Sequence, residues 1–148
     1  MPAGTIFNSS VGGTSYQFVT ATDRTSSNIG SGIPYLNTKI YEGTYVTSRY
    51  TVDTSNADQR FLITDNRADT STLRVQVQTS AGNTTVTSYT EATDITQLST
   101  TSNVYFLQEV ESAKFEVYFG DGLIGTALSE DNIVILTYVV GNREAANG

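Results

Sequence analysis

The feature that most constrains this chain is an alternation of apolar and polar residues with a period of two. It is clearest at residues 73–78 and 114–119. A period of two puts alternate side chains on opposite faces of an extended strand, so both stretches are expected to be half-buried strands. Residues 133–140 are apolar at nearly every position and rich in β-branched residues, which predicts a central strand covered on both faces.

The remaining segments complete an all-β prediction. Further strands are expected at 15–21, 38–41, 45–52, 59–63, 84–89 and 104–110, separated by turns rich in Gly and Asn. No segment has a convincing helical period. The best place for a helical turn is 91–101, where Thr93 or Asp94 could cap Ile95 to Leu98.

This pattern predicts an antiparallel β-sandwich with little or no helix, preceded by a smaller β-rich piece. A boundary is expected near residue 53, giving an N-terminal piece at 1–52 and a sandwich at 53–148. One continuous fold is the alternative. The sandwich core is expected to include Val75, Val77, Phe106, Val117, Phe119, Ile133 and Ile135.

Composition excludes several classes of function. The 148 residues include no Cys and no His, so the chain cannot supply a disulfide, a thiolate zinc site or a Ser-His-Asp triad. The formal net charge of −7 repels a phosphate backbone, and no apolar run approaches the ~18 residues of a membrane span. We therefore expect no enzymatic activity, no cofactor, no bound metal, no nucleic-acid partner and no membrane partner.

The most distinctive stretch is the loop that begins at Phe119. Asp121-Gly122 is expected to supply a turn with positive φ, and Gly120 and Gly125 lie on either side of it. The Asp121 side chain can accept hydrogen bonds from backbone N–H groups two or three residues further on. A structural loop is therefore the favoured interpretation, and a calcium ligand or catalytic carboxylate is the alternative.

Other acidic and aromatic residues have similar pairs of interpretations. Glu109 and Glu116 could form a catalytic carboxylate pair if their strands adjoin, but alternation favours ordinary water-facing acids. For Tyr41, Tyr45 and Tyr50, core packing is favoured over an interface, and an interface over a sugar platform. Solvated turns are favoured over a surface calcium site for an oxygen-rich group consisting of Asp53, Asn56, Asp58, Asp65, Asn66 and Asp69.

The C-terminal part of the chain resembles a known family. Residues 104–110, 114–125 and 132–140, with the closing Asn147-Gly148, are similar to the baseplate wedge proteins of T-even-like contractile-tailed phages. The pattern Phe-Gly-Asp-Gly, with a further Gly three residues on, is also similar to the wider J-type baseplate assembly proteins. Residues 3–7, 16–20 and 40–43 resemble the middle of the same wedge protein.

The resemblance implies a structural role rather than a catalytic one. It implies an internal fragment of a longer virion protein that is assembled in the host cytoplasm. Wedge proteins of this kind dimerise, link neighbouring wedges into a ring around the tail tube, and bind other baseplate proteins. The expected partners are therefore other baseplate wedge proteins and a second copy of the full-length protein. The alternative is a receptor- or glycan-binding β-sandwich of a tail fibre or adhesin.

Overall fold

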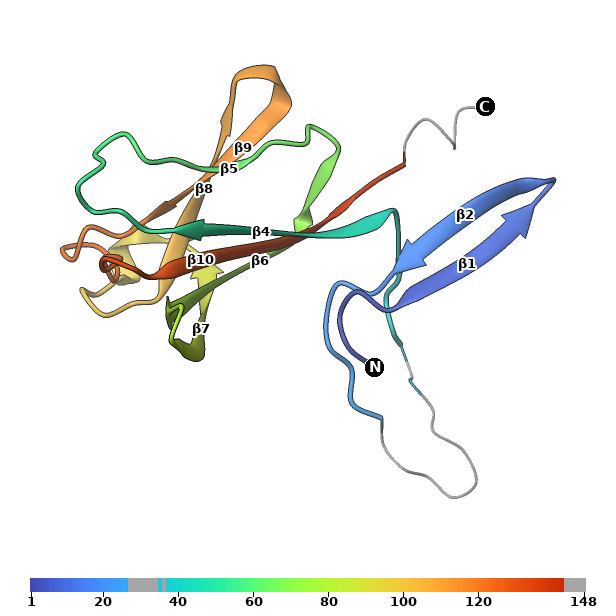
Figure 1. Cartoon of the computed structure of the whole chain (residues 1–148), viewed down its shortest axis with the longest axis horizontal. Coiled ribbons are helices and arrows are strands. Elements are labelled where there is room, and N and C mark those ends of the chain that lie inside the picture. The colour runs from blue at the N-terminus through green and yellow to red at the C-terminus, as the bar shows by residue number, and fades with distance from the viewer. Residues whose placement is uncertain (27–34, 36, 143–148) are drawn as a thin grey trace. The chain divides into compact units, whose positions relative to one another are not determined.

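The computed structural model describes residues 1–26, 35 and 37–142, which form ten strands and two short 3-10 turns (Figure 1). The strands are β1 (Ile6–Val11), β2 (Thr14–Val19), β3 (Tyr41–Glu42), β4 (Thr44–Thr51), β5 (Phe61–Ile63), β6 (Ala68–Ser80), β7 (Asn83–Glu91), β8 (Val104–Val110), β9 (Lys114–Phe119) and β10 (Ile133–Val140). The 3-10 turns are η1 (Ile95–Gln97) and η2 (Glu111–Ala113). The predicted all-β fold is confirmed.

The strands form two sheets. The smaller has the order β1-β2-β3, and the larger has the order β4-β10-β6-β7-β8-β9-β5. Strand β10 lies between two neighbours and is buried along almost its whole length, as its apolar sequence predicts. One pairing departs from the predicted antiparallel arrangement: β7 and β8 are parallel, with Thr90 opposite Val104.

Two short segments differ from the sequence prediction. Strand β1 was not expected, because Asn8, Ser9 and Ser10 interrupt any alternation between its apolar ends. The strand expected at 38–41 is limited to Tyr41–Glu42, which pair with the last two residues of β2. Such short edge strands carry little periodic signal, so pairing rather than pattern decides their bounds.

The chain divides into two compact units, each assembled from separate stretches. Unit 1 consists of Met1–Val46, Arg67–Thr72 and Tyr138–Gly148, and unit 2 of Thr47–Asn66 and Leu73–Thr137. The division into domains at 1–52 and 53–148 stays a prediction.

Unit 1 is centred on a small apolar cluster. Val19, Ala21 and Val139 are buried together, and Tyr41 and Tyr45 pack against them. The backbone between β3 and β4 also needs a glycine here: Gly43 has φ of +138°, and a Cβ would run into the Val140 carbonyl group. The favoured interpretation of Tyr41 and Tyr45 as packing residues is thus confirmed.

Unit 2 brings the two edge strands of the larger sheet together through Tyr50. The Tyr50 hydroxyl on β4 donates a 2.5 Å hydrogen bond to the Leu62 carbonyl on β5. The Tyr50 ring also meets the Phe61 ring edge to face, at 5.8 Å between centroids. Of the expected core residues, Val75, Val77, Val117 and Ile135 are buried, whereas Phe106, Phe119 and Ile133 are half-buried.

Candidate interaction surface

The loop that follows β9 is held at its start by a chain of aromatic rings. Phe119 ends β9 opposite Tyr105 of β8. Its ring lies 5.5 Å from the Phe61 ring and 5.4 Å from the Tyr89 ring, nearly perpendicular to both. These edge-to-face contacts are the favourable geometry for aromatic pairs, so the loop leaves the sheet from a fixed point.

Asp121 organises the loop itself. Its Oδ1 accepts hydrogen bonds from the backbone N–H groups of Leu123 at 2.8 Å and Ile124 at 3.0 Å, as the sequence predicts. These bonds hold the pKa of Asp121 below its ordinary value of 3.8, because they favour the ionised form. Gly122 has φ of +85°, the left-handed conformation expected for the residue after Asp121.

Gly120 and Gly125 allow the loop to fold back on the chain. A Cβ on Gly120 would lie 2.6 Å from the Gly125 carbonyl oxygen and closer still to the Ile124 carbonyl oxygen. The Gly125 N–H donates to the Ser99 carbonyl at 3.0 Å, and the Thr126 N–H donates to the Ser102 carbonyl at 2.9 Å. The loop is therefore tied to the segment that follows η1 as well as to its own backbone.

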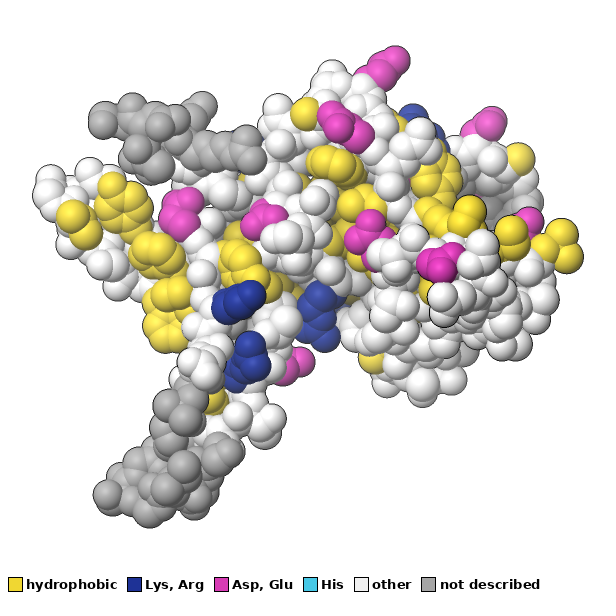
Figure 2. Space-filling view, turned by 180° about the vertical axis from the view of Figure 1, so that it is seen from behind, with side chains coloured by type: hydrophobic (Ala, Val, Ile, Leu, Met, Phe, Trp, Pro, Cys, Tyr) yellow, Lys and Arg dark blue, Asp and Glu magenta, His cyan; other side chains and the backbone are white. Residues whose placement is uncertain are grey.

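This well-anchored loop presents two apolar side chains to solvent. Leu123 is 77% exposed and Ile124 is 46% exposed. Figure 2 shows exposed hydrophobic side chains (yellow) between scattered acidic ones (magenta) on the face in view. We call Leu123 and Ile124 the apolar tip. An apolar tip on a backbone with satisfied hydrogen bonds is suited to protein contact, because little chain ordering opposes binding.

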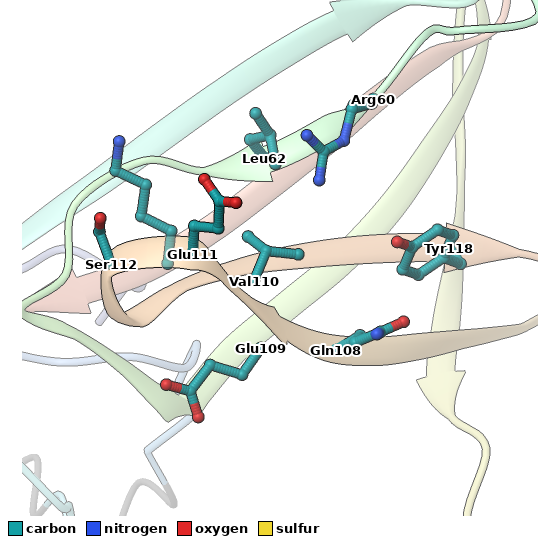
Figure 3. Close-up of a pocket in the computed structure, with 9 residues that line it drawn as sticks. Arg60, Leu62, Gln108, Glu109, Val110, Glu111, Ser112 and Tyr118 are labelled. Carbon is teal, nitrogen blue, oxygen red and sulfur yellow. The ribbon is translucent and has the colours of Figure 1, made fainter.

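A groove of about 590 Å³ lies over the outer face of β5, β9 and β8 in unit 2 (Figure 3). Arg60, Leu62 and Tyr118 contribute to its lining, together with residues of the β8–β9 turn. In that turn Ser112 and Ala113 both have positive φ, at 63° and 56°. Non-glycine residues seldom adopt this conformation, since each costs about 1–2 kcal/mol.

Glu116 on this face corrects the expectation of a water-facing acid. Its residue exposure is only 3%, because Arg60 covers it. Arg60 Nε donates to Glu116 Oε2 at 2.9 Å, and Arg60 Nη2 makes a second, shorter contact with the same oxygen. The alternation of apolar and polar residues predicts the correct face of β9 for Glu116. It does not predict that the long Arg60 side chain covers the carboxylate and excludes water from it.

The structure does not bring the Glu109 and Glu116 side chains to the same face of the sheet. Strands β8 and β9 adjoin, with Gln108 opposite Glu116 and Glu109 opposite Phe115. Residues directly opposite share a face of the sheet, so Glu109 and Glu116 project from opposite faces. In Figure 3 the Glu109 side chain extends away from Arg60 and Leu62.

In the oxygen-rich group at 53–69, Asp53 and Asn56 lie beside turns, as interpreted, whereas Asp69 lies on strand β6. Asp53 Oδ1 accepts from the Ser55 backbone at 3.0 Å, and Asp69 Oδ1 accepts from the Ser71 backbone at 3.0 Å. Asn56 Oδ1 accepts from the Asp58 backbone at 3.1 Å. Within the described residues, no three His, Cys, Asp or Glu side chains are grouped to hold a metal ion.

Acidification is expected to weaken unit 2 through Glu116. The Arg60 hydrogen bonds, aided by Tyr118 and by the Arg60 charge, hold the pKa of Glu116 below its ordinary 4.5, although burial opposes them. A carboxylate with a lowered folded pKa stabilises the fold above its unfolded pKa, and this stabilisation is lost as the pH falls through the folded pKa. Arg60→Met should therefore lower the urea midpoint near neutral pH. In acid, the midpoints of the variant and the parent chain should become equal.

The matched control is Lys39→Met, which removes the same charge from an exposed position. Urea midpoints of the three chains, measured from neutral pH to well below pH 4.5, give the comparison. Equal midpoints for Arg60→Met and the parent chain throughout that range would show that the ion pair contributes nothing.

Comparison with known families identifies the chain. Among the described residues, no helix has the length and apolar character needed to cross a membrane. A search of curated protein sequences finds no match. The family model described as bacteriophage baseplate wedge protein gp6, third domain, matches residues 47–147, which include β5 to β10 and the loop after β9. The chain therefore belongs to the bacteriophage baseplate wedge protein family and is a structural component of the tail baseplate.

Proposed function

We propose that this chain is a non-catalytic interaction module that links wedges of the baseplate around the tail tube. It binds other baseplate wedge proteins and, in the full-length protein, a second copy of itself. Assembly takes place in the host cytoplasm before the module is incorporated into the virion. Family membership supports the structural role, and the apolar tip is the observation that carries the proposed contact.

The apolar tip has the properties of an interface anchor. Burying an exposed Leu side chain contributes about 1.5–3 kcal/mol, and a few well-packed side chains carry most of the binding energy of an interface. Asp121 and the Ser99 carbonyl already hold the surrounding backbone. Binding therefore requires little further ordering of the loop, which leaves more of the burial energy for affinity.

The electrostatics of Glu116 support a role without catalysis. A general acid needs a raised pKa, which apolar surroundings or a neighbouring carboxylate provide. Glu116 has a lowered pKa instead, and its oxygen is occupied by Arg60. Glu109 lies on the other face of the sheet and cannot act with it.

The test is binding to the other wedge proteins of the same phage. The double variant Leu123→Ser with Ile124→Ser should bind them at least about tenfold more weakly, corresponding to about 1.4 kcal/mol. Its melting temperature should match that of the parent chain, because both side chains are exposed. Copurification from coexpressed wedge proteins, followed by titration of each partner found, gives the measurement.

A matched control is available in the same unit. Val86 on β7 is 46% exposed, as is Ile124, so Val86→Ser removes a similar apolar surface elsewhere. This control should leave binding unchanged. Equal binding by the double variant and the parent chain would reject the apolar tip as the contact.

The receptor-binding alternative has its own measurement. A thermal shift of the chain with one glycan from a panel, with or without calcium, would favour that role. The baseplate proposal predicts no shift with any glycan.

A further inference from the structure

Strand β1 in unit 1 has an open edge. Its residues pair only with β2 among the described residues, in the register Ile6 to Val19 through Val11 to Thr14. Every residue of β1 is exposed, including the apolar Ile6, Phe7 and Val11. In Figure 1, β1 and β2 form a two-stranded ribbon closed by a tight turn.

The direction of the backbone groups on β1 follows from the hairpin geometry. Gly12 and Gly13 form a two-residue turn with φ of +60° and +86°, so Val11 and Thr14 close the hairpin as a hydrogen-bonded pair. At the other end, the Thr20 N–H donates to the Thr5 carbonyl at 3.1 Å. Hydrogen-bonded and non-hydrogen-bonded pairs alternate along an antiparallel ladder. The backbone groups of Ile6, Asn8 and Ser10 therefore point away from β2.

This edge lacks the usual protection against strand pairing. Exposed edges are normally blunted by Lys, Pro or a bulge, or are very short. Residues 3–22 contain no charged residue and no proline, in a chain whose formal net charge is −7. By contrast, β3, the other edge strand of the small sheet, has only two residues. Strand β1 is thus the longer of the two edges of the small sheet in the described residues.

We propose that β1 pairs antiparallel with β1 of a second copy, with the two-fold axis at Asn8. Asn8 then faces Asn8 of the second copy, and Ile6 faces Ser10 of the second copy in both directions. This register satisfies every outward-facing backbone group of Ile6, Asn8 and Ser10, since all three belong to hydrogen-bonded pairs. The two small sheets become one continuous sheet. This inference rests on the proposed self-association and specifies that the two β1 strands form its contact.

Charge and geometry favour a second copy as the occupant. Two acidic chains repel each other, and their approach is least opposed where both surfaces are uncharged. Residues 6–10 pair symmetrically about Asn8, so the same backbone groups serve both partners of an isologous contact. A contact of two six-residue strands is small compared with standard interfaces, so this chain is expected to form a weak dimer.

The test is sedimentation velocity of the whole chain over a wide range of protein concentration. The parent chain should show reversible dimerisation. Asn8→Pro should remain monomeric, because it removes an outward N–H and adds a ring at the open edge. The matched control is Ser15→Pro, which alters an exposed, outward-facing position of β2 instead and should dimerise like the parent chain.

A charge pair provides a second test that does not depend on proline. Asn8→Lys and Asn8→Glu should each be monomeric, since like charges then face each other across the axis. An equimolar mixture of the two should restore the dimer. Circular dichroism and melting temperatures of all variants should match those of the parent chain, which shows that the hairpin is intact.

Two results would overturn the inference. One is a parent chain that stays monomeric at every concentration. The other is a dimer that survives both Asn8→Pro and Asn8→Lys, which would place self-association on another surface and leave the proposed function intact. Failure of the proposed function itself would appear separately, as unchanged binding of wedge proteins by the variant lacking the apolar tip.

Discussion

Replacing Leu136 with Ala is expected to lower the free energy of unfolding by about 3–5 kcal/mol. Leu136 lies on β10, which has a neighbouring strand on each side. It has 0% exposure, among the largest fully buried side chains in the described residues. Truncation removes buried methyl groups and leaves a cavity, and both effects destabilise the fold. Urea unfolding followed by circular dichroism gives the value from the shift of the midpoint at constant slope.

The control for this prediction is the same substitution at a surface position. Leu123→Ala should change the free energy of unfolding by less than about 0.5 kcal/mol, because the side chain is 77% exposed. If the two variants unfolded at the same urea concentration, that result would contradict the burial of the Leu136 side chain.

Gly120→Ala is the second substitution with a large expected effect, a loss of about 3 kcal/mol, at the upper end of the usual cost of overpacking. The new methyl group would be too close to the carbonyl groups of Ile124 and Gly125, and both are backbone atoms that cannot move aside as a flexible side chain can. The isolated bridge between Gly120 and Ala127 would break, together with the fold of the loop. The same urea experiment measures the loss.

Substitutions at two other glycines distinguish steric crowding of the new methyl group from backbone strain. At Gly122 the nearest atom to a Cβ is 3.7 Å away, but φ is +85°, so Gly122→Ala should cost only about 1–2 kcal/mol from backbone strain. At Gly82 no atom lies within 4 Å and φ is not positive, so Gly82→Ala should be nearly neutral. A Gly120→Ala chain as stable as Gly82→Ala would contradict the close approach.

Features that depend on near neighbours in the chain could be predicted from the sequence. The Asp121 side chain bonds the backbone two and three residues on, as Asp residues in turns do. Asp94 caps η1 by accepting from the Thr96 N–H at 2.9 Å, in the segment where a helical turn was expected. These interactions span so few residues that identity and spacing alone specify them.

Features that depend on distant residues could not be predicted in this way. Arg60 and Glu116 are separated by 56 residues, and only the pairing of β5 with β9 brings them together. The crowding at Gly120 likewise exists only because the loop turns back on itself. No local pattern distinguishes an acid covered by a long cation from an acid in water, since both occupy polar positions of a strand.

The sequence by itself determined the all-β class, the covered central strand and the local geometry of the loop after β9, because periodicity and turn chemistry act over a few residues. Only the tertiary structure decided which edges are closed and which surfaces remain exposed. The Tyr50 hydroxyl joins β4 to β5, whereas β1 stays open on its outer side in the described residues. Strand order sets these outcomes, and strand order is a property of long-range pairing that a two-residue period does not encode.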